Sequence, residues 1–190
     1  MPPRSKISRE DIVDAAFSVV RESGIEQMNT RQVAQHLGCS TQPVMYHFKT
    51  MEILRQEAYK RADLFHTEFL LSGKSDDVMP FLRIGLNYIR FAWEEAPLFR
   101  FLFQSGYSPH RTIMEIVDSD ELRPLLSALQ KETSLGLGRA KEVFMTLALL
   151  THGYASLLSN HHIEYDEALV ISHLTRALHG AILAAQEEPK

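Results

Sequence analysis

Apolar residues recur at three- and four-residue spacing along almost the whole chain, and this helical period limits the fold more than any other feature. No stretch alternates between apolar and polar residues as a half-buried strand does. The first periodic run lies between a capping residue, Ser8, and a natural stop, Gly24. We therefore predict an all-α fold of about nine helices.

Short helices come first in this pattern and long ones last. After the first helix we predict short helices over 31–37 and 41–48 and a long helix over 50–71, with a first domain over 1–50 and a second over 51–190. The next helix is expected to begin near Ser75, with Pro80 in its first turn. Further helices are expected over 98–104, 109–117, 120–132, 139–159 and 166–186.

Composition excludes several classes of protein. With 190 residues, 45% of them hydrophobic, the chain can bury a core of its own. One cysteine, Cys39, permits no internal disulfide framework and no multi-cysteine zinc site. The sequence has no run of about 18 apolar residues, as a bilayer span needs, and its first residues lack the apolar segment of a secretory signal. We expect a cytoplasmic protein.

Charge is distributed unevenly along the chain. The formal net charge of −4 taken alone argues against binding to a polyanion, yet no acidic residue occurs between Gln27 and Met51, a window of 25 positions in a chain with 24 acids. Arg31 and Lys49 are the lysines and arginines of that window. The pattern indicates a surface that approaches negative charge.

Two short helices joined by a glycine-containing turn occupy this acid-free window. Gly38 tolerates a positive φ, and Pro43 at the third helical position fixes Ser40 as the N-cap, as Thr30 is the predicted cap of the preceding helix. Small Ala34 allows a close helix crossing. The inward residues are then Val44, His47 and Phe48, and the outward ones Thr41, Gln42, Met45 and Tyr46.

That outward face carries an amide, a hydroxyl and apolar groups. Glutamine can bond adenine through two hydrogen bonds, and a methyl group can contact the methyl of thymine. The motif therefore favours a DNA-reading helix-turn-helix. Two short helices of an ordinary bundle are the alternative.

The first sixty residues resemble the tetracycline-repressor (TetR) family of bacterial transcription regulators. The resemblance implies a three-helix DNA-binding head, a fourth connecting helix, and a helical body that senses a ligand and dimerises. The residues that carry it are Ile12, Ala15, Ala16, Gly24, Thr30, Arg31, Val33, Ala34, Leu37, Gly38, Ser40, His47, Phe48, Glu52 and Leu54.

By this resemblance the helix start at Thr30 and Arg31 contacts the DNA backbone, and His47 and Lys49 lie at the groove edge. The sequence departs from the family at Met45, usually tyrosine, and at Met51, usually lysine; Tyr46 or Lys49 can substitute. The predicted DNA-contacting set is Arg4, Lys6, Thr30, Arg31, Ser40, Thr41, Gln42, Pro43, Met45, Tyr46, His47 and Lys49.

The second domain is expected to pair two chains through its last two helices. The predicted stripes are Val143, Leu147, Leu150, Tyr154, Leu157 and Leu158 on the first, and Leu169, His173, Ala177, Gly180, Ala181 and Ala184 on the second. Small residues permit close helix packing. The alternative is that both helices form the core of a monomer.

The second domain also looks loosely like one sensor-body subtype of the family, a resemblance that says little about the ligand. Aromatic and methionine side chains of this domain would suit an apolar or aromatic effector of unknown identity. The candidates are Trp93, Phe99, Phe103, Tyr107, His110, Met114, Met145 and His152. A metal site remains an alternative, with His152, His161, His162, His173 and His179 as its ligands. We expect core or surface roles for these histidines, and no metal or cofactor.

The sequence contains no glycine-rich phosphate loop, no nucleophile elbow and no evident pair of catalytic carboxylates. We therefore expect no enzyme but a ligand-responsive regulator, most simply a repressor, that binds a palindromic operator as a homodimer. Two alternatives stay open: a helical protein that binds or sequesters small molecules, with or without an enzymatic activity, and a protein-interaction module that uses Met45, Tyr46 and Met51.

Overall fold

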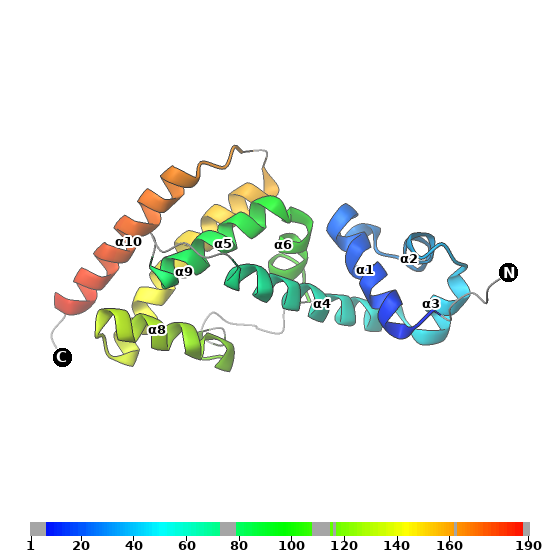
Figure 1. The fold of residues 1–190 in the computed structure, drawn as a ribbon, viewed down its shortest axis with the longest axis horizontal. Helices are drawn as coiled ribbons and strands as arrows, with labels where there is room; N and C mark the ends of the chain where they lie inside the picture. Colours follow the sequence, from blue (N-terminus) through cyan, green and yellow to red (C-terminus); the bar gives the residue numbers. More distant parts are fainter. Residues whose placement is uncertain (1–6, 73–78, 108–114, 116, 162, 188–190) are drawn as a thin grey trace. The chain divides into compact units, whose positions relative to one another are not determined.

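The protein is described here by a computed structural model that covers residues 7–72, 79–107, 115, 117–161 and 163–187. The described part of the chain is helical and contains no strand, which confirms the predicted all-α class (Figure 1). The elements are α1 Arg9–Ser23, η1 Ile25–Gln27, α2 Thr30–His36, α3 Thr41–His47, α4 Met51–Leu71, α5 Pro80–Glu94, α6 Ala96–Phe103, η2 Asp120–Leu122, α8 Arg123–Thr133, α9 Leu137–Asn160 and α10 Glu167–Glu187.

Two compact units divide the chain. Unit 1 comprises residues 1–68 and 95–108, and unit 2 comprises 69–94 and 109–190. Most of α4 therefore belongs to unit 1, and its last turn to unit 2. The predicted division into residues 1–50 and 51–190 follows the helix-turn-helix rather than these packing units, and it stays a prediction about function.

Helix α1 begins and ends where its sequence predicts. The Ser8 hydroxyl accepts a hydrogen bond from the Asp11 backbone N–H at 3.0 Å, and the Asp11 carboxylate accepts one from the Ser8 N–H at 2.8 Å. These hydrogen bonds lower the pKa of Asp11. At the other end Gly24 has φ 84° and ψ 165°, a conformation open essentially to glycine alone.

Helix α4 contributes one buried residue per turn to unit 1. Its buried positions recur at every fourth residue: Leu54, Ala58, Ala62 and His66. This spacing places one narrow face of α4 in the core of unit 1. Aromatic contacts add to the same core, because the rings of Phe17 and Phe65 meet edge to face at 5.5 Å.

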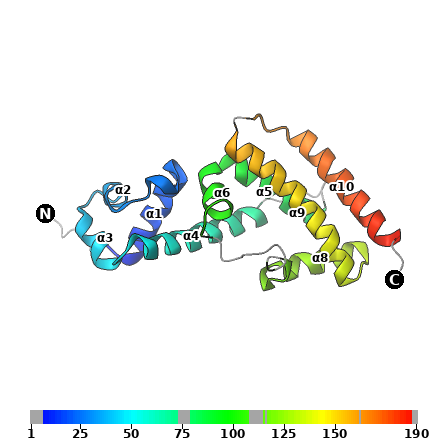
Figure 2. The same ribbon diagram turned by 180° about the vertical axis from the view of Figure 1, so that it is seen from behind.

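Unit 2 is a helical core built mainly from α5, α9 and α10, with α8 packed against it (Figures 1 and 2). Helix α5 lies close to both α9 and α10 at Gly85. A Cβ atom at this position would lie 3.6 Å from the Thr151 hydroxyl of α9 and 3.7 Å from Leu174 of α10. The buried residues of this core include Leu82, Ile89, Leu129, Val143, Leu147, Val170, Leu174 and Leu178.

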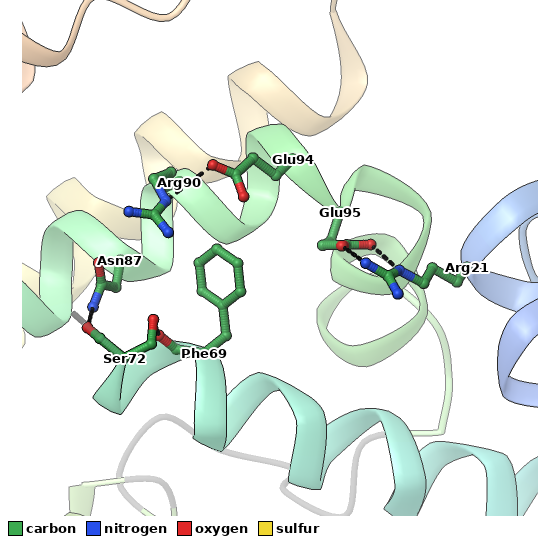
Figure 3. A network of polar contacts seen from close by, with 7 residues as sticks. All are labelled: Arg21, Phe69, Ser72, Asn87, Arg90, Glu94 and Glu95. Carbon is green, nitrogen blue, oxygen red and sulfur yellow. Dashed lines mark hydrogen bonds and ion pairs between the residues drawn. The ribbon is translucent and has the colours of Figure 1, made fainter. Parts of the chain in front are cut away.

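The end of α4 is held within unit 2 by α5. Buried Asn87 donates hydrogen bonds to the carbonyl oxygens of Leu70 and Ser72, both at 2.9 Å, and so satisfies acceptors that a helix end leaves open. Figure 3 shows the bond to Ser72. The Phe69 ring meets Phe91 at 5.3 Å and lies under the Arg90 guanidinium at 5.0 Å. An amide between two long helices thus fixes where α4 stops.

Several predicted helix boundaries differ from the structure. Asn29, not Thr30, caps α2: its side-chain oxygen accepts from the backbone N–H groups of Arg31 and Gln32 at 3.1 Å. Ser40 has the extended backbone of an N-cap but makes no side-chain capping bond. The predicted helix opening at Ser75 and most of the helix predicted over 109–117 lie outside the described residues.

Candidate nucleic-acid interface

The turn between α2 and α3 has the backbone geometry that the sequence predicts. Gly38 adopts φ 63°, and the backbone N–H of Cys39 donates to the Ala34 carbonyl at 3.0 Å. Buried Val33 and Ala34 of α2 and Val44 of α3 have exposed fractions of 0–2%. Small Ala34 lets the two helices cross closely, so the turn and the core together fix the direction of α3.

The outer face of α3 is open to solvent. Met45 is 65% exposed and Tyr46 is 82% exposed, and Thr41 and Gln42 are exposed as well. Phe48, at the end of the helix, is buried under the Arg9 guanidinium, which lies 4.8 Å from its ring centroid. The predicted orientation of α3 is therefore confirmed: its base-facing candidates point outward.

The charges on this side of unit 1 leave cations unpaired. Arg31 and Lys49 are exposed and form no ion pair with any residue that the structure describes. Two acids of unit 1 pair with cations of their own, and the first is Asp14, which meets Arg61 at 3.1 Å. Glu57 meets Lys60 and Arg9, hydrogen bonds that lower the pKa of Glu57. A phosphate approaching α3 therefore meets positive charge.

Two predicted contact residues are less available. The Thr30 hydroxyl donates to the Met51 thioether at 3.2 Å, which joins the starts of α2 and α4. His47 is half-buried, and its ring meets Tyr46 edge to face at 5.2 Å. Arg31, Ser40, Thr41, Gln42 and Lys49 are exposed and Pro43 is half-buried; Arg4 and Lys6 lie outside the described residues.

The candidate effector residues fall in different units. In unit 1 the Phe99 and Phe103 rings meet at 5.0 Å, and Tyr107 meets Phe101 at 5.8 Å. Two surface hollows of unit 1, of about 410 and 250 Å³, are lined by other residues.

In unit 2, exposed Trp93 stacks on Tyr165 at 5.3 Å, and His152 bonds the Tyr88 hydroxyl at 2.9 Å. Met145 is half-buried there. His110 and Met114 lie outside the described residues. Within the described ranges, no group of three or more His, Cys, Asp or Glu side chains is placed to bind a metal ion.

His66 was missed by the sequence analysis. Its imidazole is 7% exposed and meets the Phe103 ring at 5.1 Å, and burial lowers the pKa of His66 to about 4. Burial therefore keeps this imidazole neutral at neutral pH. The signal was the spacing itself, since His66 continues the buried series of α4 that begins at Leu54.

Arg21 of α1 and Glu95, the residue before α6, form a bidentate ion pair in unit 1 (Figure 3). The Arg21 Nε donates at 2.7 Å, and these hydrogen bonds raise the pKa of Arg21. Glu95 is 9% exposed, and the guanidinium also covers the Phe65 ring at 4.9 Å. The pair ties the start of α6 to α1.

Arg21→Ala is expected to lower the free energy of unfolding by about 2 kcal/mol, because it leaves a buried carboxylate without its partner. Urea denaturation followed by circular dichroism measures the change. Arg123→Ala is the control, since its pair with Asp120 is solvent-exposed on both sides and such pairs contribute under about 1 kcal/mol. Equal effects of the two variants would contradict the assigned importance of the Arg21 pair.

Comparison with known proteins gives a consistent result. No protein-family model matches the chain. The tetracycline repressor proteins of class D from Escherichia coli and class H from Photobacterium damsela subsp. piscicida are each 28% identical to it over 79 residues. That stretch is 42% of this chain and 36% of each relative, so the match spans about a third of the relatives' length.

Solved structures match over nearly the whole chain. A TetR-family member from Streptomyces coelicolor A3 superposes with a TM-score of 0.56 at 19% identity, covering 89% of this chain and 96% of that one. BioQ from Mycobacterium smegmatis gives 0.56 at 16% identity, covering 93% and 98%. The chain has the all-α fold of TetR-family proteins, as its first sixty residues led us to expect.

Proposed function

We propose that this protein is a DNA-binding transcription regulator that works as a homodimer and responds to a small molecule. The observation that carries the proposal is the outer face of α3, which is solvent-exposed, free of carboxylates and held on a closed helix-turn-helix core. The match to tetracycline repressor proteins supports it. The proposal assigns the chain no catalytic step, and it places the protein in the cytoplasm.

In this proposal each dimer places two α3 helices in successive major grooves about 34 Å apart, so the operator is a palindrome. Arg31 and Lys49 contact phosphates and set the register, whereas Thr41, Gln42, Met45 and Tyr46 meet base edges. Arg4 and Lys6 add electrostatic contacts, and Thr30, Ser40, Pro43 and His47 complete the interface.

The pairing surface is proposed to lie on α9 and α10. The stripe predicted on α9 was wrong at five of its six positions: Val143, Leu147 and Leu158 are buried in the core of unit 2, and Leu150 and Tyr154 pack against it. The sixth residue, Leu157, is exposed. Helix α5 of the same chain covers this face of α9, so the face belongs to the core of unit 2. The exposed leucines of α9 are Leu137, Leu149 and Leu157, and Gly153 lies midway between the last two.

Helix α10 agrees better with its predicted stripe. Leu169, Gly180 and Ala184 are exposed, whereas Ala177 and Ala181 pack on the core. His173 is half-buried, and its ring bonds the Tyr154 hydroxyl. Only 22% of the most apolar 18-residue window of α10 is buried, with a mean hydropathy of 1.4. By length and composition this helix could cross a membrane; pairing with a second copy, as the family resemblance implies, is the proposed use.

The response to an effector is proposed as a shift between two states. Helix α4 follows α3 in unit 1, and Asn87 holds its last turn in unit 2. It therefore connects the DNA-binding helices of unit 1 to unit 2. An effector that favours a different spacing of the two heads releases the operator, which is the simplest repressor mechanism. Moving from mostly bound to mostly released requires a preference of about 5 kcal/mol for the released form.

A protein-interaction module is the second candidate, because Met45 and Tyr46 form an exposed apolar patch. A gel-shift titration with the DNA upstream of the protein's own gene, at two salt concentrations, separates the candidates. The regulator binds with a sequence preference and weakens steeply as salt rises. An interaction module captures a protein partner that DNA does not displace, and a sequestering protein binds no duplex at all.

Gln42→Ala is expected to weaken binding to the preferred duplex by about tenfold or more while leaving affinity for random duplex nearly unchanged, since it removes a base contact and no charge. Fluorescence anisotropy with both duplexes measures the two affinities. Gln56→Ala, on the exposed surface of α4, is the matched control. Equal losses on both duplexes would count against base reading by Gln42.

A further inference from the structure

The exposed side chains of α3 are chemically uniform in one respect: none carries a charge. Met45 and Tyr46 are 65% and 82% exposed, and Thr41 and Gln42 are exposed as well. The cations of this region, Arg31 and Lys49, lie outside the helix, before and after it. The exposed face of α3 is therefore uncharged and carries one amide, one small hydroxyl side chain and two large, mainly apolar side chains.

The major groove presents a different pattern for each base pair. Guanine is read chiefly by arginine or lysine, and cytosine offers a donor that suits a carboxylate. Adenine is read by glutamine or asparagine, and the thymine methyl is met by apolar side chains. The exposed face of α3 holds neither group suited to G·C pairs and both groups suited to A·T pairs.

Helix geometry places these groups against neighbouring base pairs. Met45 and Tyr46 follow Gln42 by three and four positions, so all three share one face. At about 1.5 Å rise per residue they lie about 4.5–6 Å further along the helix axis, one to two base-pair steps of 3.4 Å. One glutamine and two apolar side chains thus span two or three successive base pairs.

We propose that α3 selects A·T pairs in each operator half-site, with Gln42 bonded to an adenine and Met45 and Tyr46 packed against thymine methyl groups. This inference rests on the DNA-binding function proposed above and specifies its DNA substrate. Most of the sequence discrimination then comes from burial of thymine methyls rather than from charge-assisted hydrogen bonds. Arg31 and Lys49 supply affinity that does not depend on sequence.

The first experiment selects the preferred duplex from a random library with the full-length protein. The expected consensus has A·T pairs at the positions that α3 contacts in each half-site. A consensus of G·C pairs at those positions would overturn the inference while leaving the proposed function intact. Failure to enrich any sequence, together with binding that salt does not weaken, would remove the proposed function as well.

The second experiment replaces single thymines of the selected operator by deoxyuridine, which deletes only the methyl group. Burial of one methyl corresponds to about a fourfold change in affinity. We expect about this loss at one or two thymines of each half-site and none at flanking thymines. Substitution at every thymine with less than a twofold change would overturn the inference.

Variants assign each methyl to its side chain. For Met45→Ala and for Tyr46→Ala, we expect one of the sensitive positions to lose its deoxyuridine effect: operators with thymine or deoxyuridine there bind with equal affinity. The reason is that the side chain that packs on that methyl group is gone. Both residues are exposed, so the fold is retained. Leu64→Ala, an exposed apolar truncation on α4, is expected to keep the full deoxyuridine effect. Sensitivity unchanged in both α3 variants would contradict the assignment.

Discussion

Aspartate in place of Val44 is expected to unfold the helix-turn-helix, whereas aspartate at the next position is expected to leave it folded and to abolish DNA binding. Val44 is 1% exposed and packs between α2 and α3, and Met45 is 65% exposed. A carboxylate at position 44 has no partner and loses its hydration, at a cost of about 3–5 kcal/mol. At position 45 it stays in water and changes stability by about 0.5 kcal/mol or less.

The binding consequence at position 45 is electrostatic. Two added carboxylates per dimer would face the phosphate-lined groove within the window that otherwise has no acid, and we expect at least a hundredfold weaker binding at moderate salt. Circular dichroism melting gives the stability of both variants, and anisotropy gives their affinity. Met45→Asn is the neutral control. A stable Val44→Asp, or a Met45→Asp variant that binds like wild type, would contradict the orientation of α3.

Leu183→Glu is expected to convert the dimer to a monomer. Leu183 is 58% exposed on α10, on the same face as Leu169 and Gly180. Because a two-fold interface repeats each contact, the substitution buries two like charges near one another and removes two apolar contacts. Sedimentation velocity at micromolar concentration measures the change, and operator affinity should fall with it.

Ser127→Glu is the matched control for this prediction, since it adds the same charge at an exposed position of α8 rather than of α10. It should remain a dimer. A wild-type protein that sediments as a monomer, or a Leu183→Glu variant that stays dimeric, would contradict pairing through α10. Partition of the wild-type protein onto lipid vesicles would instead assign the apolar face of α10 to a membrane.

Residue preferences at helix caps and turns predicted the positions where the backbone needs a particular residue type. Gly24 and Gly38 have positive φ, Ser8 forms its capping box, and Pro43 occupies the third position of α3. Each of these features depends on the conformational preferences of a single residue type, which can be read from the sequence. The cap of α2 was misassigned to Thr30 because Asn29 and Thr30 are both capping residues, and only the backbone shows which one has the extended conformation.

Faces were harder to predict than helices. The periodicity of α9 identified an apolar stripe, but it could not show that α5 covers that stripe within the same chain, so Leu147 was assigned to an interface. The pair between Arg21 and Glu95 joins segments distant in sequence. Spacing along one helix carries no information about such partners, and the candidate effector residues suffered from the same limit.

Photo-crosslinking at α3 tests the central claim most directly. With p-benzoylphenylalanine in place of Tyr46, the full-length protein should crosslink to its selected operator, and unlabelled operator should compete. The same group in place of Leu64, about 20 Å along α4 from its first residue, should not crosslink. A crosslink absent at position 46, or equally strong at both positions, would contradict the entry of α3 into the groove.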